Sequence, residues 1–214
     1  MNTQGQWHMA LTGLAFVILG VVSFAIVGDV PTPGDDSARE IVRFYEDNET
    51  VVAVGSVLAC LAGALFVLFG VYLRSAIRAV QPDPGGDLVP LALVVGTAIF
   101  ATGLALDSAL NVALIDTAGD MSPAATEALS ALWNNDFPVF GTGLFIVMLS
   151  LAYSTLRYGV LPKWMGCVAV VLVVISPTPA GFVGFLGGLV FIAVTSVVLA
   201  VRGRRTTATP MVSA

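Results

Sequence analysis

The feature that most constrains this chain is a series of apolar runs separated by turn residues or charges. The runs extend over residues 10–28, 51–73, 89–115, 137–156, 161–176 and 180–201. About 20 apolar residues in a helix are needed to cross a hydrocarbon core about 30 Å thick. The mean hydropathy of +0.93 is also higher than a water-soluble domain carries. We therefore predict an all-α polytopic membrane protein: one bundle of six transmembrane helices over residues 1–201, followed by a short, disordered cytoplasmic tail over 202–214.

The charges between these runs predict an orientation. Seven of the nine Lys and Arg residues would lie at one face of a six-helix bundle, and the positive-inside rule makes that face cytoplasmic. At the opposite face, 11 Asp and Glu residues occur with only Arg39 and Arg43. We predict a multi-pass protein of the cell membrane, with both termini in the cytoplasm and two acidic segments outside.

Each acidic segment carries a signal for a short helix. In the first, Ser37 and Glu40 have the spacing of a capping box, in which both side chains satisfy free backbone N–H groups, and apolar residues follow on one helical face. In the second, Ser122 precedes Pro123, the combination typical of a helix start. We expect two amphipathic helices, near 37–48 and 122–134, on the outer face of the bundle.

The fifth apolar run is the shortest. Its 16 residues span about 24 Å as a helix at 1.5 Å per residue, which is less than the thickness of the hydrocarbon core. The turn that follows, with Pro177 and Pro179, is therefore expected to lie below the outer membrane surface, near Asp107.

Small residues recur at four-residue spacing in three of the runs. Such stripes let helix backbones approach closely, which is how helices associate in lipid. The pattern fits packing within one chain and also a homo-oligomer interface. The stripes are Gly55/Ala59/Gly63, Ala101/Ala105/Ala109 and Gly184/Gly188.

One short motif carries a resemblance to known proteins. The segment from Gly159 to Gly166 reads GVLPKWMG and resembles the G-V-L-P-[KR]-W-x-G run of many small six-helix bacterial membrane proteins of unknown function. The plan of the chain is similar over about 200 residues. The resemblance implies a fold and a membrane location, and it supplies no activity.

Asp107 is the most informative polar residue because it lies near the outer end of the third apolar run. An ionisable group there costs about 1–3 kcal/mol, so it usually faces the bundle interior or water. Asn111 lies one turn further along the same face, and Trp133 and Asp136 lead into the fourth run. We take these four residues as a candidate ligand-binding site for a small molecule, a cation or a proton. A purely structural hydrogen bond is the alternative for Asp107, and a solvated turn with an interfacial tryptophan is the alternative for Trp133 and Asp136.

Other chemistry finds little support in the sequence. There is one histidine, one lysine and no nucleotide-binding GxxxxGK[ST] motif, and the net charge of −5 argues against nucleic acid. We expect no catalytic residues, no metal, no cofactor and no nucleotide. The leading prediction is a non-enzymatic protein that binds or passes a small molecule or ion through an outward-facing pocket. A structural or accessory subunit with a membrane-protein partner is the alternative, and an intramembrane enzyme is the third.

Overall fold

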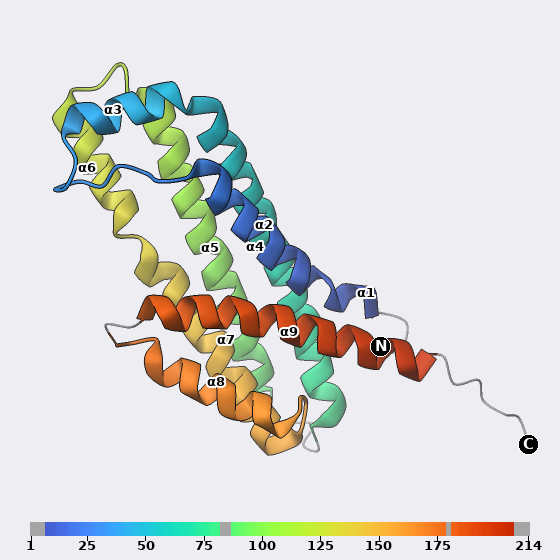
Figure 1. The fold of residues 1–214 in the computed structure, drawn as a ribbon. Helices are drawn as coiled ribbons and strands as arrows, with labels where there is room; N and C mark the ends of the chain where they lie inside the picture. Colours follow the sequence, from blue (N-terminus) through green and yellow to red (C-terminus); the bar gives the residue numbers. More distant parts are fainter. Residues whose placement is uncertain (1–6, 82–86, 179–180, 208–214) are drawn as a thin grey trace, which may run out of the picture.

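The computed structural model describes residues 7–81, 87–178 and 181–207, and the regular secondary structure in these ranges is helical throughout (Figure 1). The prediction of an all-α bundle is therefore confirmed. The helices are α1 (Trp7–Ala10), α2 (Thr12–Val27), α3 (Ala38–Asp47), α4 (Glu49–Val80), α5 (Leu88–Thr117), α6 (Pro123–Asn134), α7 (Phe137–Tyr158), α8 (Lys163–Ile175) and α9 (Gly181–Thr207).

Five helical stretches among the described residues are long and apolar enough to cross a membrane. They are Trp7–Val27, Glu49–Val80, Leu88–Thr117, Pro123–Tyr158 and Gly181–Arg204. Helix α8 has only 13 residues and falls below that length. The structure thus supports a multi-pass membrane protein, while a sixth crossing through α8 stays a prediction.

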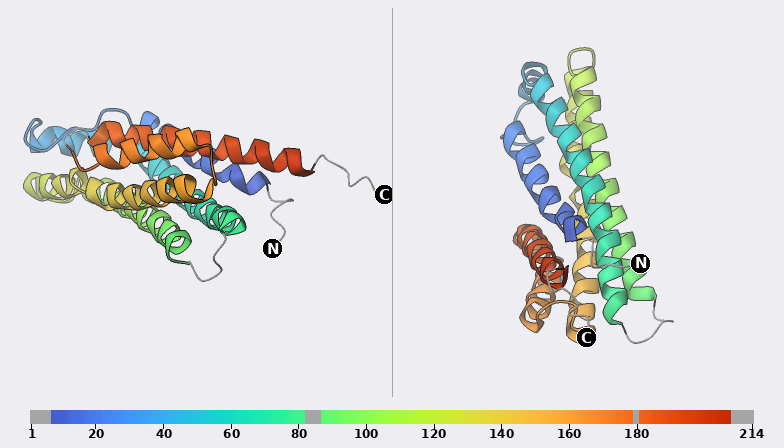
Figure 2. Two further views of the ribbon diagram at one scale, coloured as in Figure 1. Left: turned by 90° about the horizontal axis from the view of Figure 1, so that it is seen from below. Right: turned by 90° about the vertical axis from the view of Figure 1, so that its right-hand side faces the viewer.

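The helices form a layered bundle in which α5 is central. Helix α5 packs between α4 and α7, and α2 covers the other side of α4. Helices α8 and α9 make a hairpin that crosses the long helices obliquely (Figures 1 and 2). Pro179 and Ala180, in the turn expected near Asp107, lie outside the described residues. At the end of the bundle where α4 begins and α5 ends, α3 and α6 pack against each other.

The two predicted short helices are present, but they differ in direction. The capping box forms: the Ser37 hydroxyl and the Glu40 carboxylate each satisfy the other residue's backbone N–H. Helix α3 then lies across the end of the bundle, as expected for a surface helix (Figure 1). Helix α6 instead runs on toward α7, separated from it by only Asn135 and Asp136, so α6 and α7 resemble one interrupted helix. Ser122 occupies the N-cap position of α6 without a side-chain capping bond.

The GVLPKWMG segment is a turn between two packed helices. Gly159 ends α7 in the left-handed conformation, at φ 72° and ψ 29°, which glycine adopts without a steric penalty. Val160 and Leu161 are buried, and Pro162 precedes the first residue of α8. Gly166 lies directly against Leu156. The glycines and the buried apolar residues of the motif therefore have packing roles here, whereas Lys163 and Trp164 are exposed.

Glycines set the closest helix contacts in the bundle. A Cβ atom on Gly143 of α7 would lie 2.4 Å from the backbone nitrogen of Phe100 and 2.7 Å from the Gly96 carbonyl oxygen, both in α5. A Cβ on Gly103 would lie 2.9 Å from Phe140. These distances are below any ordinary contact, so α5 and α7 touch backbone to backbone.

The small-residue stripes are used mostly within the chain. Gly55 packs against Val27 of α2, and Gly63 packs against Ala101 of α5. In α9, Gly188 meets Leu144 of α7. Ala105 and Ala109 are exposed on the outside of α5.

Six phenylalanine rings fill the centre of the bundle where these helices meet. They come from α2, α4, α5, α7 and α9 and make stacked and edge-to-face contacts with centroids 4.3–6.2 Å apart. The rings are Phe16, Phe66, Phe100, Phe137, Phe140 and Phe185, and we call them the phenylalanine cluster.

A serine from α9 is inserted at the start of α2. The Ser196 hydroxyl donates to the Ala10 carbonyl and accepts from the Leu14 backbone N–H at 3.0 Å. In a continuous helix those two backbone groups would bond to each other, and a side chain that replaces such a bond interrupts the helix. The separation of α1 from α2 at Leu11 therefore has an identifiable cause.

The segment predicted as a tail, from residue 202, begins inside helix α9. Helix α9 continues to Thr207, and Arg202 donates to the Val160 carbonyl oxygen at 3.1 Å. That contact holds the end of α9 against the turn between α7 and α8. Residues 208–214 lie outside the described residues.

The Gly143→Ala substitution tests the backbone contact between α5 and α7. We expect it to lower the free energy of unfolding by about 1–3 kcal/mol, because the new methyl group overpacks a site with no room. Gly141→Ala is the matched control, since its Cβ would lie 3.5 Å from Phe137, an ordinary contact. Unfolding in detergent, followed by circular dichroism, measures both. Equal stability of the two variants would contradict the inferred contact.

Candidate functional site: a polar cluster around Asp107

The Asp107 carboxylate lies in the bundle where α5 meets α6. Its Oδ1 atom accepts a hydrogen bond from the Trp133 indole N–H at 2.7 Å. Its Oδ2 atom lies 3.4 Å from the Asn111 amide nitrogen, which also donates to the Asp107 backbone carbonyl at 3.2 Å. Asp107 is half-buried and Asn111 is buried. The predicted inward direction of Asp107 is confirmed, and its first partners are two of the residues named from the sequence.

The other residue named from the sequence, Asp136, is also close. It lies at the break between α6 and α7, is 9% exposed, and interacts electrostatically with Asp107. The site thus contains one carboxylate from α5 and one from the break between α6 and α7. Among the described residues, neither carboxylate forms a salt bridge.

Tyr45 brings α3 into the same site. Its ring is fully buried, and its hydroxyl interacts with Ser130 of α6, although the geometry falls short of a regular hydrogen bond. Burial raises the pKa of the Tyr45 hydroxyl, and the negative charge of Asp107 raises it further. Tyr45 therefore stays protonated and is available as a hydrogen-bond donor near the carboxylate.

Several buried polar atoms in this region have no hydrogen-bond partner among the described residues. A buried polar atom without a partner costs about 1–3 kcal/mol, and such atoms in native proteins usually contact a water, an ion or a ligand. The unpartnered atoms on these helices are Tyr45 Oη, Asn111 Oδ1, Thr126 Oγ1, Ser130 Oγ and Asp136 Oδ2.

Two of these five residues, Asn111 and Asp136, were named from the sequence. Thr126 and Ser130 occupy the α6 face that also carries Trp133, at i, i+4 and i+7, but they were not singled out because isolated hydroxyls in helices are common. In the sequence, Tyr45 is one of the residues on the apolar face that follows the capping box. Its position eight residues after the N-cap Ser37 places Tyr45 on α3. Its hydroxyl reaches Ser130 only because α3 packs against α6, and this tertiary contact cannot be derived from the local sequence.

The phenylalanine cluster closes the bundle below the site. Asp107 lies one helical turn beyond Gly103, which touches Phe140, and two turns beyond Phe100. The aromatic rings therefore fill the space between the polar cluster and the basic end of the chain. The polar cluster thus lies between these rings and the helices α3 and α6.

The side chains of this site are better suited to binding a ligand through oxygen atoms than to covalent catalysis. The donor atoms are carboxylate, amide, hydroxyl and phenol oxygens, which hard cations prefer. Among the described residues there is no group of three or more His, Cys, Asp or Glu side chains that would form a dense metal site. The two carboxylates therefore act with neutral oxygens rather than with further acids.

Comparisons with protein-family models, curated proteins and solved structures found no match to this chain. The site is therefore interpreted from its own geometry.

The Trp133→Phe substitution tests whether the indole N–H supports Asp107. We expect the free energy of unfolding to fall by about 1–3 kcal/mol, because the half-buried carboxylate loses its 2.7 Å donor. Trp164→Phe is the control, because Trp164 is 59% exposed. Thermal unfolding in detergent measures both variants. If they lose the same small amount of stability, the hydrogen bond to Asp107 contributes nothing.

Proposed function

We propose that this protein binds a small cation at the polar cluster around Asp107, on the side of the bundle covered by α3 and α6. The observation that carries the proposal is the presence of two carboxylates, half-buried Asp107 and buried Asp136, at an end of the bundle where the helices also carry buried oxygens without partners among the described residues. A bound cation would neutralise the negative charge of both acids, and the unpartnered oxygens would act as its ligands. We regard the chain as a binding protein rather than an enzyme. It could also be a transporter, in which case this structure is one of its conformations.

Electrostatics favour a positive ligand over a neutral or anionic one. Two negative charges in a low-dielectric site repel each other, and each is more stable when a cation or a proton neutralises it. Among the described residues, the basic side chains that form ion pairs are bound to other acids: Arg43 to Asp47, and both Arg74 and Arg78 to Asp87. The positive charge is therefore expected from a ligand.

The packing favours binding at one side over an open channel. The phenylalanine cluster fills the bundle below Gly103, so a cation at Asp107 has no continuous polar path onward through the described residues. Passage would require Phe100 and Phe140 to move apart. Their backbones are held by the contact of α5 with α7, which supports a stable closed state.

We also propose that the α3 and α6 end faces the cell exterior, in the cell membrane, with both termini in the cytoplasm and six crossings in total. The support is the distribution of charge: the acidic segments flank α3 and α6, and the basic residues follow the other helix ends. The resemblance of the GVLPKWMG segment to small bacterial six-helix membrane proteins is consistent with this plan.

The Asp107→Asn substitution tests the proposed cation site. The amide is nearly the same size and still accepts from Trp133, so we expect the fold to be kept while cation binding is lost. At 100 times the Kd, a bound cation stabilises the folded state by about 2.7 kcal/mol, which is visible as a shift in Tm. Wild-type protein in detergent is heated with increasing Na⁺ or Ca²⁺, with choline chloride matching ionic strength.

Asp116→Asn is the control, because Asp116 is an exposed carboxylate on the same helix. Its cation response should equal that of the wild type. An unchanged response in Asp107→Asn would instead make Asp107 structural. In that case Asp107→Leu should show a stability cost of about 1–3 kcal/mol, because Asn111 and Trp133 lose their partner. Copurification with a stoichiometric membrane protein, together with no cation response, would favour the accessory-subunit alternative.

The orientation is tested by labelling single cysteines in intact cells. In a background with Cys60 and Cys167 replaced by alanine, we expect a membrane-impermeant maleimide to modify cysteine at positions 35 and 120. Positions 78 and 157 should react only after the cells are opened, because both would face the cytoplasm. Labelling at 78 or 157 in intact cells, with protection at 35 and 120, would reverse the proposed orientation.

A further inference from the structure

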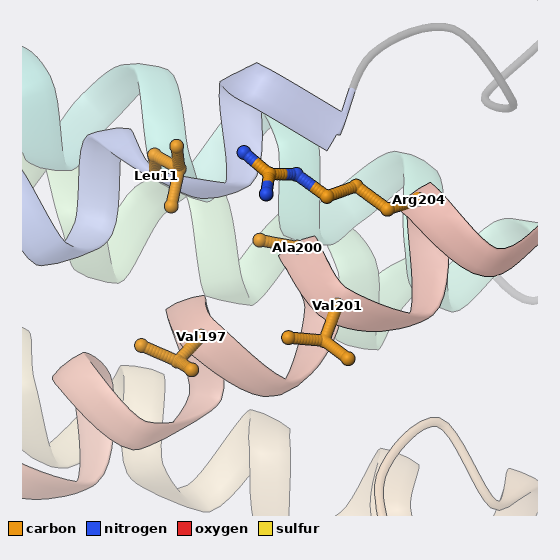
Figure 3. A pocket seen from close by; sticks show the side chains of 5 residues that line it. All are labelled: Leu11, Val197, Ala200, Val201 and Arg204. Carbon is orange, nitrogen blue, oxygen red and sulfur yellow. The ribbon is translucent and has the colours of Figure 1, made fainter. Parts of the chain in front are cut away.

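A second feature of the molecule lies far from Asp107, on the outside of α9. Leu11, Val197, Ala200, Val201 and Arg204 line a groove with a volume of about 130 Å³ (Figure 3). Four of these residues come from α9, at i, i+3, i+4 and i+7, so they form one helical face. Leu11, at the break between α1 and α2, forms the facing wall.

The groove changes character along its length. The side chains of Val197 and Val201 are about 43–44% exposed. The small side chain of Ala200 lies between them in the lining of the groove. Arg204 lies one turn further along α9, toward its C-terminal end, and is exposed. The groove is thus apolar for most of its length and carries a guanidinium at one end.

The guanidinium of Arg204 is held in place and lacks an acidic partner. Its Cζ atom lies 4.0 Å from the centre of the Trp7 ring, a cation–π contact. Gly203 allows this contact, because its Cβ would lie 3.0 Å from the Trp7 Cβ atom. Among the described residues no carboxylate forms a salt bridge with Arg204, whereas Arg74 and Arg78 both pair with Asp87.

We infer that this groove binds one anionic phospholipid, with the phosphate at Arg204 and part of an acyl chain along Val201 and Val197. An arginine presents a planar fork of donors that fits a phosphate, and an apolar channel beside it fits an acyl chain. Basic residues beside helix grooves at the membrane boundary are a known arrangement for anionic headgroups. Trp7 also suits the membrane interface, where tryptophan is enriched. The inference is independent of the cation site.

The structure explains why the groove exists. The Ser196 hydroxyl interrupts the helix between Ala10 and Leu14, so α1 departs from the direction of α2 and brings Trp7 to Gly203. Arg202 is engaged with the Val160 carbonyl, which fixes the end of α9. Arg204 is therefore the described arginine that lies on the groove face.

Native mass spectrometry of the full chain in detergent tests the inference with defined lipids. Dioleoyl phosphatidylglycerol should bind about tenfold more tightly than dioleoyl phosphatidylcholine, which corresponds to about 1.4 kcal/mol. Arg204→Gln should reduce this preference to about one. Arg157→Gln removes an exposed arginine outside the groove and should keep the preference. If Arg204→Gln retains the preference, or Arg157→Gln loses it equally, the inference is wrong.

A second variant tests the acyl-chain part of the groove and leaves the charge in place. Val197→Trp should weaken binding of both lipids by about tenfold, because the indole occupies the groove, and an exposed position tolerates the larger side chain. Inorganic phosphate added at millimolar concentration should not displace phosphatidylglycerol. Displacement by phosphate, together with unchanged lipid binding in Val197→Trp, would show a simple phosphate site and overturn the lipid assignment.

Discussion

The backbone contact between α5 and α7 is the constraint on which the rest of this structure depends. In lipid, apolar side chains gain little by leaving one apolar surrounding for another, so helices are held by close packing and by hydrogen bonds between them. Gly96, Gly143 and Gly103 allow α5 and α7 to approach until backbone atoms touch. That approach fixes the positions of Phe100 and Phe140, from which the phenylalanine cluster is built.

The same contact explains where a polar cluster is tolerated. Below Gly103 the interior is filled mainly by aromatic rings, which offer a carboxylate no conventional hydrogen-bond donor. One turn further, α6 separates from the line of α7 at Asn135 and Asp136, and α3 closes over the end. Trp133 and Asn111 then donate to Asp107. The break between α6 and α7 thus creates the space that the carboxylates occupy.

Much of this fold was predictable because its signals are local. The ends of α5 and α7 lie within two residues of the ends of their apolar runs, whereas α4 continues to Val80, seven residues beyond its run. The capping box of α3 forms as its spacing indicates. The direction of α6 and the helical continuation of α9 to Thr207 were not predictable, because both depend on tertiary contacts. For the site, Asp107 stood out as a lone charge in an apolar run, whereas the Tyr45 hydroxyl is recruited by the packing of α3 on α6.

Buried hydroxyls without partners occur elsewhere in the bundle, so they do not by themselves mark a functional site. Ser154, Thr155 and Thr195 are fully buried and unpartnered among the described residues, yet each is an isolated neutral group. A buried neutral group without a hydrogen-bond partner lowers the free energy of unfolding by about 1–3 kcal/mol, and a stable bundle tolerates that loss. Buried carboxylates are different, because the cost of an uncompensated charge rises steeply as water is excluded. The presence of two carboxylates, Asp107 and Asp136, rather than the number of unpartnered oxygens, therefore distinguishes the end of the bundle covered by α3 and α6.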